Sequence, residues 1–402
     1  MADPAPNAKF VEQTTAVRSP NQIAWAKLKQ HTLAIYGGLV LIVLYLAALF
    51  ADVLAPYDFE TQFRTKPWHP PSVIHWRHAD GTFSTPFVYN TVKLRDEAYQ
   101  AHFVEVSPEN MEFLKGRIGP SFKDQPTEYH LKFFPKGDPH KFLGVIAMER
   151  RLFGVESNDS LNRPAFFLLG SEQLGRDLFS RILYGSRVSL SVGLIGVVIT
   201  FTLGMTIGGI SGYFRGKTDT VLQRLIEMIM LLPGFYIMLS LRAALPPDLG
   251  TIQTYFAIIL ILSFIGWAGL ARTTRGLVMS ISQNDYITAS RALGVSSLSL
   301  IMKHILPQTF SYAVVVASMA IPGYMLGESG LSYLGLGIQE PYSSWGNMLQ
   351  AAGTGNDIKL HPWVLVPGFM IFITIVAWNF LGDGLRDAFD PKTILNAKKG
   401  GA

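Results

Sequence analysis

The sequence predicts an all-α polytopic membrane protein with six transmembrane helices and a β-containing insert between the first two. Of the 402 residues, 49% are hydrophobic and only 16% are charged, below the roughly 25% of ordinary soluble domains. Five uncharged runs each have about the 20 residues that a helix needs to cross the hydrocarbon core. These runs are residues 33–51, 188–214, 249–271, 305–327 and 362–382.

A sixth span is predicted between the second and third of these runs. Residues 228–241 are apolar but short, contain Pro233-Gly234 and end near Arg242. A helix bundle tolerates a proline break, and an arginine near a helix end can extend its charged group to the membrane interface. The alternative for this segment is a re-entrant loop.

Basic residues on the short flanking segments orient the chain. Lysines and arginines precede the first span, lie between spans two and three and between four and five, and follow the sixth. By the positive-inside rule, both termini are cytoplasmic. Residues 1–31 and 391–402 are then cytoplasmic tails and residues 32–55 form the first span. No cleavable signal peptide is expected.

Residues 56–169, between spans one and two, are predicted to form a folded extracytoplasmic insert. The segment is rich in charge, proline and aromatic residues, and FVYNTV and YHLKFF have the composition of strands. His69, His75 and His78 are six and three residues apart in a proline-broken stretch, which fits no usual metal-ligand spacing. We interpret them as surface histidines and predict no metal site.

Residues 170–390 form the five remaining spans, and their cytoplasmic loop 272–304 is far longer than a turn requires. Within this loop, a helix with small side chains ends at Gly294, a residue suited to a helix C-terminus. Ser296 or Ser297 caps a second helix. One face of that helix is expected to carry Leu298, Ile301, Met302 and Ile305. We interpret this helix–turn–helix as a docking element that transmits force from a soluble partner; the alternative is a loop that only packs under the bundle.

Gly216-Lys217-Thr218 is the closing triplet of a phosphate-binding loop, but the rest of that motif does not fit. The first glycine would be residue 211, which is Ser211, and a membrane helix precedes it instead of a strand. We therefore expect no nucleotide or other cofactor on this chain and assign no catalytic residue. The absence of cysteine excludes disulfides and thiolate sites. The net charge of +5 comes from residues beside apolar runs, a distribution that does not favour nucleic-acid binding.

Separated motifs resemble the inner-membrane permease subunits of ABC importers, in the group that takes up dipeptides, oligopeptides and nickel. The motifs are SPNQIAWAKLKQHTLAIYGG with FADVLAPYD, LGSEQLGRDLFSRILYGSRVSLSVG, DYITASRALGVSSLSLIMKHILP, and GLSYLGLGIQEPYSSWGNML with NFLGDGLRDAFDP. They are most similar to the second, C-type permease of that group. The resemblance implies an ABC importer type I permease-like fold in a bacterial cytoplasmic membrane.

The resemblance also implies a transport subunit without enzymatic activity of its own. A second homologous permease would complete the translocation path for di- or oligopeptides. Two cytosolic ABC ATPases, which hold ATP and Mg²⁺, and an extracytoplasmic substrate-binding protein would complete the importer. A nickel chelate or another small solute stays open as an alternative cargo, because the insert is larger than is usual in this family.

The family's coupling motif falls on the helix–turn–helix. Its usual Glu-Ala-Ala start is Thr288, Ala289 and Ser290 here, whereas its glycine is kept as Gly294 and its Leu-Pro close ends at Pro307. A membrane-skimming helix without a partner is the alternative. The resemblance implies ATPase contacts at Asp285, Tyr286, Thr288, Ala289, Ser290, Arg291, Leu293, Gly294, Val295, Ser296 and Pro307.

Three charged residues are candidates for the translocation path or its gate. Glu328, the one acidic residue in the fifth span, either contacts a peptide amine or bonds neighbouring helices. Arg176 and Asp177 are expected on an interfacial helix at the outer gate or under the binding protein, or else in a local ion pair. A secondary transporter is disfavoured because the sequence shows no matched halves, and a membrane receptor because no output domain follows Pro391.

Overall fold

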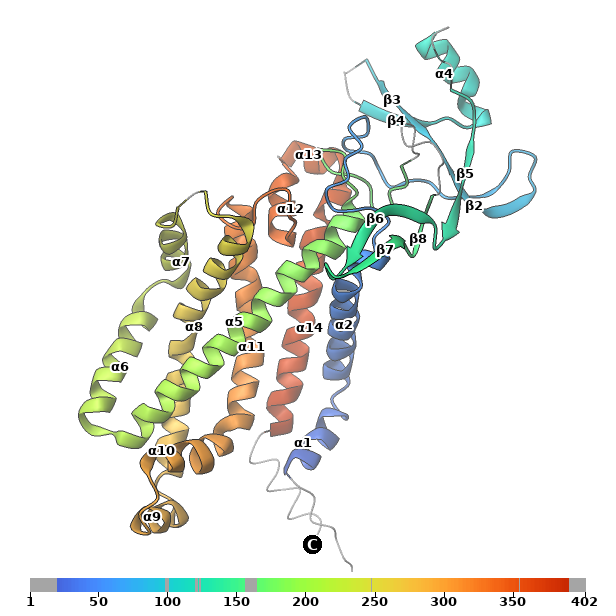
Figure 1. Ribbon diagram of the computed structural model, residues 1–402. Coiled ribbons are helices and arrows are strands. Elements are labelled where there is room, and N and C mark those ends of the chain that lie inside the picture. The colour runs from blue at the N-terminus through green and yellow to red at the C-terminus, as the bar shows by residue number, and fades with distance from the viewer. Residues whose placement is uncertain are drawn as a thin grey trace, which may run out of the picture.

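The computed structural model describes residues 20–97, 101–119, 122, 124–155, 165–246, 248–353 and 355–389. Figure 1 shows a bundle of long helices with a β-rich insert at one end and the short helix α9 (Asp285–Ala292) at the other. We call these the insert end and the α9 end. The expected tail 391–402 and residues 1–19 of the expected tail 1–31 lie outside the described residues.

Long helices form over the apolar runs, because a helix satisfies its own backbone hydrogen bonds away from water. Short helices fill the connections. Besides α9, the helices of the bundle are α1 (Pro20–Leu28), α2 (Thr32–Leu49), α3 (Ala51–Leu54), α5 (Leu178–Phe214), α6 (Gly216–Leu231), α7 (Gly234–Ala243), α8 (Thr251–Ile281), α10 (Ser297–Ser299), the π-helix η2 (Leu300–Ile305), α11 (Leu306–Tyr333), α12 (Trp345–Ala351), α13 (Gly355–Leu360), the 3₁₀-helix η3 (Pro362–Leu365) and α14 (Val366–Phe389).

Among the described residues, five helical stretches are long and apolar enough to cross a membrane: 32–49, 178–214, 251–281, 297–333 and 362–389. The segment predicted as the third span forms a bent pair, in which α6 and α7 meet at 86°, and it raises the count to six where the pair is taken as one broken span. The bend lies at Pro233, which lacks the N–H that a continuous helix would need. Arg242 is 5% exposed, and its Nε donates to the carbonyl of Leu336 (2.6 Å).

The bent pair carries the chain from one end of the bundle to the other. Ser263 of α8 donates to the carbonyl of Gly196 of α5 (3.2 Å), and further along both helices Gly212 lies against Val278. The helices α5 and α8 therefore run parallel, and the segment between them must return to the insert end. Figure 1 shows α6 and α7 making this return along one side of the bundle.

Three glycines spaced four residues apart bring α5 against α8. A Cβ on Gly208 would lie 2.4 Å from the carbonyl oxygen of Ala271, and one on Gly212 would lie 2.6 Å from that of Arg275. Gly204, one turn earlier, is also buried against α8. Small residues at this spacing allow two helix backbones to approach closely in a membrane protein.

The insert contains eight strands, the 3₁₀-helix η1 (Pro108–Asn110) and a short α-helix among its described residues. The strands β1, β2, β5 and β8 form an antiparallel sheet in that order, while β3–β4 and β6–β7 are separate hairpins. Strands occur where FVYNTV and YHLKFF predicted them. The elements are β1 (His75–Arg77), β2 (Phe83–Tyr89), β3 (Thr91–Arg95), β4 (Ala101–Glu105), α4 (Met111–Ile118), β5 (Glu128–Phe133), β6 (Lys136–Phe142), β7 (Ile146–Arg150) and β8 (Phe153–Val155).

The interpretation of the three histidines as surface residues is wrong for His69, which is only 2% exposed. Its Nε2 lies 2.8 Å from Oγ1 of Thr91, and the Lys66 ammonium donates to the same hydroxyl (3.0 Å). Burial lowers the pKa of His69 to about 4 and that of Lys66 to about 8. These two side chains therefore resist charging inside the insert.

His75 and His78 lie beside carboxylates of the insert. His75 Nε2 is 3.0 Å from Glu105, and His78 Nδ1 is 2.7 Å from Glu128. Within the described part of the chain, no three His, Cys, Asp or Glu side chains are placed to hold a metal ion.

Candidate functional site

A helix–turn–helix forms at the α9 end, where the sequence predicted it. Helix α9 ends at Ala292, and Gly294 adopts φ +85°, which a residue without a Cβ reaches most easily. The amide of Gly294 donates to the carbonyl of Arg291 (3.0 Å), and the amide of Val295 donates to that of Ser290 (3.2 Å). These bonds satisfy the last carbonyls of α9. The predicted role of Gly294 at the helix C-terminus is confirmed.

One buried side chain fixes α9 to the bundle. Ile287 is fully buried in a hydrophobic cluster that it shares with Tyr213 of α5, Val278 of α8 and Ile305 of η2. This cluster therefore packs α9 against α5, α8 and the segment that leads into α11.

Polar contacts strengthen the attachment of α9. The Nε2 of Gln308 donates to the Tyr286 hydroxyl (2.5 Å). The guanidinium of Arg291 lies 5.0 Å from the centre of the Tyr213 ring, within range of a cation–π interaction.

The outward side of the helix–turn–helix is apolar at its centre. Leu293 is 85% exposed, Leu298 is 69% exposed and Tyr286 is 45% exposed. Figure 1 shows α9 projecting beyond the ends of the long helices. Exposed apolar side chains gathered at one projecting turn are typical of a protein interaction site.

The expectation that one face carries four apolar side chains after the turn is wrong. Ile301 and Ile305 are buried, whereas Leu298 and Met302 are exposed. The π-helix η2 supplies the reason, because its wider turn moves successive side chains off the 3.6-residue stripe. Two of the four residues therefore pack inward and two remain available outside.

The residues predicted to contact a partner lie on one continuous segment, except for Pro307 in the first turn of α11. Ser290 and Val295 are half-buried, and the other residues are exposed. The exposed ones are Asp285, Tyr286, Thr288, Ala289, Arg291, Leu293, Gly294, Ser296 and Pro307.

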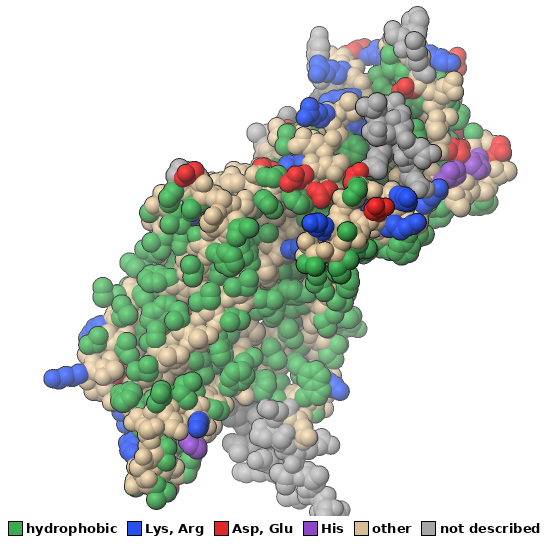
Figure 2. All heavy atoms as spheres, viewed as in Figure 1, with side chains coloured by type: hydrophobic (Ala, Val, Ile, Leu, Met, Phe, Trp, Pro, Cys, Tyr) green, Lys and Arg blue, Asp and Glu red, His purple; other side chains and the backbone are tan. Residues whose placement is uncertain are grey.

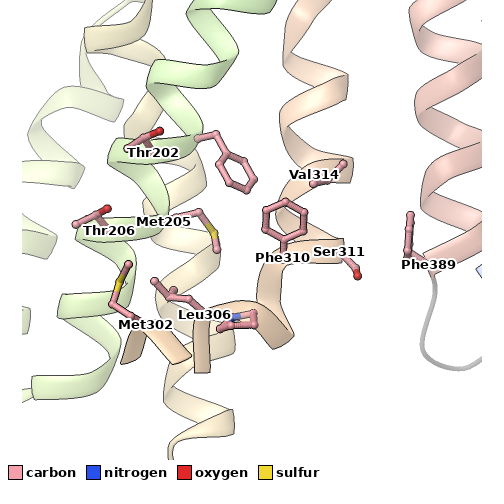
Figure 3. A pocket seen from close by; sticks show the side chains of 11 residues that line it. Thr202, Met205, Thr206, Met302, Leu306, Phe310, Ser311, Val314 and Phe389 are labelled. Atoms are coloured by element: carbon pink, nitrogen blue, oxygen red, sulfur yellow. The ribbon is translucent and has the colours of Figure 1, made fainter. Parts of the chain in front are cut away.

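A hollow of about 720 Å³ adjoins this segment, and its lining side chains are all uncharged. Figure 3 shows Phe310 of α11, Met205 of α5 and Phe389 of α14 around it. Met302 and Pro307 also line the hollow, so the helix–turn–helix forms part of its wall.

Glu328 is fully buried in α11, where serine hydroxyls surround its carboxylate. Ser332 donates to Oε1 (2.7 Å), and Ser189 of α5 lies at the limit of hydrogen bonding from Oε2 (3.5 Å). The Ser189 hydroxyl also accepts from the backbone amide of Trp345 at the start of α12 (3.0 Å). Through these bonds Glu328 connects α5, α11 and α12.

Arg176 and Asp177 do not lie on an interfacial helix as expected, because residues 170–177 form a loop and α5 begins at Leu178. Asp177 is the N-cap residue of α5, and its Oδ2 accepts from the backbone amide of Ser180 (2.8 Å). An N-cap carboxylate satisfies an amide that has no partner within the helix. Asp177 therefore fixes where α5 starts.

Arg176 belongs to an ion-pair cluster, which we define as the buried Glu172, Arg176 and Arg181 together with the partly exposed Glu340. Arg176 pairs with Glu172 and with Glu340, and Arg181 Nη2 lies 3.1 Å from Glu340 Oε1. Both guanidinium groups are nearly inaccessible to solvent. The cluster joins the loop before α5 to the segment after α11.

Sequence reasoning missed the other three members of this cluster. The spacing of four residues between Glu172 and Arg176 was an available signal. Glu340 is 164 residues away from Arg176, and nothing local indicates that pairing. The three glycines of α5 were also missed, although their spacing of four is visible in the sequence.

Comparisons with known proteins match most of the chain outside the insert. Residues 204–395 match the family "Binding-protein-dependent transport system inner membrane component", and residues 19–71 match the N-terminal transmembrane domain of oligopeptide transport permease C. A chain of the inward-facing MetNI methionine ABC transporter aligns with a TM-score of 0.41 at 16% identity, covering 52% of this chain and 97% of that chain.

Two curated relatives are similar over more than half of the chain. The dipeptide transport system permease protein DppC of Bacillus subtilis (strain 168) is 41% identical over 224 residues, covering 56% of this chain and 68% of that protein. The oligopeptide transport system permease protein OppC of Haemophilus influenzae is 39% identical over 228 residues, covering 56% of this chain and 71% of that protein.

Proposed function

The chain belongs to the family of binding-protein-dependent inner membrane transport components, and on that premise we propose that it is the C-type permease subunit of an ATP-driven peptide importer. The observation that carries the proposal is the projecting helix–turn–helix, which exposes Leu293 and Leu298 and buries Ile287. Its outer side suits a soluble ATPase, and its inner side connects to the spans.

Coupling follows from this attachment. When nucleotide closes a pair of ATPase subunits, α9 and its turn move with the subunit that holds them. The cluster around Ile287 passes the movement to α5, α8 and α11, which shifts the bundle between outward-open and inward-open states. ATP drives the change only to the extent that it favours the docking geometry of one state.

The proposed importer needs a second permease, two cytosolic ATPases and an extracytoplasmic binding protein. ATP and Mg²⁺ belong to the ATPases, and this chain holds no cofactor. The cargo is a di- or oligopeptide, as the names of the two relatives indicate. Pathway residues come from both permeases, so the hollow near Phe310 supplies only this chain's share, whereas the fully buried Glu328 bonds neighbouring helices.

In the proposed topology, the chain crosses a bacterial cytoplasmic membrane six times, with the bent α6–α7 pair as the third span. The α9 end and both termini are cytoplasmic, and the insert is extracytoplasmic. Figure 2 shows Lys and Arg side chains at both ends of the molecule, with a largely hydrophobic surface between them. That surface agrees with a membrane-spanning bundle, and the proposed orientation rests on the Lys and Arg residues of the short flanking segments.

Substitution of Gly294 tests the coupling assignment. A Cβ at Gly294 would meet nothing within 4 Å, so Gly294→Trp adds bulk outside the chain and not inside it. Gly294→Ala is the matched control, because it introduces the same strain at φ +85° without the bulk. We expect Gly294→Trp to abolish ATPase co-purification and peptide uptake, and Gly294→Ala to retain both.

ATP turnover supplies an independent test. The purified chain should hydrolyse no ATP, and reconstitution with the ATPases and the second permease should produce turnover. Peptide uptake by the Gly294→Trp importer at the rate of the unsubstituted one would refute the coupling assignment. ATP hydrolysis by the isolated chain would refute the division of labour between subunits.

A further inference from the structure

The β6–β7 hairpin carries apolar side chains at a tip that projects from the insert. Val145 is 83% exposed, Ile146 is 59% exposed and Leu143 is 49% exposed. At the other end of the hairpin, before Lys136, Phe133 and Phe134 are 80% and 53% exposed. We call Leu143, Val145 and Ile146 the apolar tip. A soluble domain has no evident reason to present such a group to water.

The turn itself is also unusual for a water-exposed hairpin. Leu143 and Gly144 have φ +50° and +75°, and the amide of Val145 donates to the carbonyl of Phe142 (3.1 Å). Turns with positive φ at both central positions favour Asn or Asp before the glycine. A leucine there is strained and exposes an apolar side chain, so its presence points to an apolar surrounding.

Direct contacts hold the tip beside the insert end of the first span. Phe142 stacks on Phe50, with ring centres 5.8 Å apart. The backbone amide of Leu143 donates to Oδ2 of Asp52 (2.9 Å). Nearby, the amide of Leu152 donates to the carbonyl of Val53 (2.7 Å). The tip is therefore fixed at the level where α2 ends, not free to swing.

The end of α2 nearest the tip also exposes apolar side chains. Leu46, Leu49 and Phe50 are 49%, 44% and 43% exposed on the last turns of α2, the side on which a span meets lipid. Figure 2 shows hydrophobic side chains passing from the bundle onto the underside of the insert.

We propose that the apolar tip inserts into the headgroup region of the bilayer beside α2, as a second membrane anchor of the insert. Lys136, Lys141 and Arg150 are exposed on the same hairpin, where their charged ends would meet lipid phosphates while their stems lie along apolar surface. Asp138 and Glu149 are the acidic side chains of this hairpin. The proposal depends on α2 being a membrane span and not on peptide import.

Anchoring would hold the insert at a constant height and orientation above the membrane. The hairpin is continuous with the four-stranded sheet, because β5 precedes it and β8 follows it, and these two strands pair at Phe133 and Phe153. A tip buried in the headgroups would therefore limit the tilt of the whole sheet during transport.

Site-directed spin labelling can measure the depth of the tip, because the chain contains no cysteine. Val145→Cys and Ile146→Cys are made separately, labelled with a nitroxide and reconstituted as one full chain per nanodisc containing phosphatidylglycerol and phosphatidylethanolamine. Leu46→Cys on α2 is the reference inside the bilayer. Phe113→Cys on α4, the helix farthest from the bundle in Figure 1, is the exposed reference.

The readout is the ratio of collisions with oxygen, which enriches in lipid, to collisions with a water-soluble nickel chelate. We expect both tip labels to give a ratio well above that at residue 113 and below that at residue 46, because the headgroup region lies between water and hydrocarbon. A ratio at the tip equal to that at residue 113 would overturn the proposal. Low collision rates with both reagents would overturn it too, because they would show that protein and not lipid covers the tip.

Discussion

Replacement of Gly208 by alanine tests the helix packing at the centre of the bundle. The added Cβ would lie 2.4 Å from the carbonyl oxygen of Ala271 and 2.8 Å from Cβ of Thr274. Neither neighbour can rotate away, because a backbone carbonyl and a Cβ are fixed by the course of α8. The helices α5 and α8 must therefore separate, and the close contact at Gly212 is weakened as well.

The size of the effect follows from two opposing terms. Gly→Ala favours the helical conformation by about 1 kcal/mol, whereas overpacking a closely packed contact costs about 1–3 kcal/mol. Gly269→Ala is the matched control, because Gly269 lies in α8 near the same level and a Cβ there would meet nothing within 4 Å. It therefore gains the helix-propensity term without the overpacking cost, and the difference between the two variants measures that cost. We expect Gly208→Ala to have a free energy of unfolding lower than that of Gly269→Ala by about 1–3 kcal/mol.

The measurement is unfolding of the detergent-solubilised chain by titration with SDS, followed by the circular dichroism of its helices. Gly269→Ala should unfold at the same or a higher SDS fraction than the unsubstituted chain, and Gly208→Ala should unfold at a lower SDS fraction than Gly269→Ala. Equal midpoints for the two variants would show that α5 and α8 do not touch through these glycines, and the parallel packing described above would then be wrong.

Three further predictions concern the insert and the two ends of the bundle. Between pH 6.5 and about 4, His69 binds a proton in the unfolded chain but not in the folded chain, where its ring is buried. The free energy of unfolding of the insert should therefore fall by up to about 3 kcal/mol as the pH falls. His69→Gln should remove this pH dependence, measured by hydrogen exchange of β2 and β5. Glu172→Gln should lower the free energy of unfolding by about 3–5 kcal/mol, because it leaves the buried guanidinium groups without one of their two counter-charges. Glu340→Gln should lower it by less, because Glu340 is 46% exposed. Equal losses for the two variants would contradict this reasoning. Asp219→Asn should cost about 1–2 kcal/mol, because its carboxylate accepts two bonds from Arg275 (2.5 and 2.6 Å), and an unchanged SDS midpoint would show that this pair contributes nothing.

The sequence by itself determined the elements that depend on local chemistry. Uncharged runs predicted the long helices because unpaired backbone groups cannot be left in hydrocarbon. Gly294 predicted the end of α9 because a positive φ is easiest without a Cβ. The failed expectation of one apolar face after that turn has an equally local cause, since η2 departs from the 3.6-residue period.

The tertiary structure alone decided which distant segments meet. Arg176 and Glu340 come together only when the loop before α5 lies beside the end of α11, and His69 is buried only when β3 covers it through Thr91. The apolar tip likewise lies beside the first span only because Phe142 stacks on Phe50, which comes 92 positions earlier in the sequence. Periodicity and composition report how one segment is solvated, whereas these pairings depend on the relative placement of several segments, which no single stretch of sequence encodes.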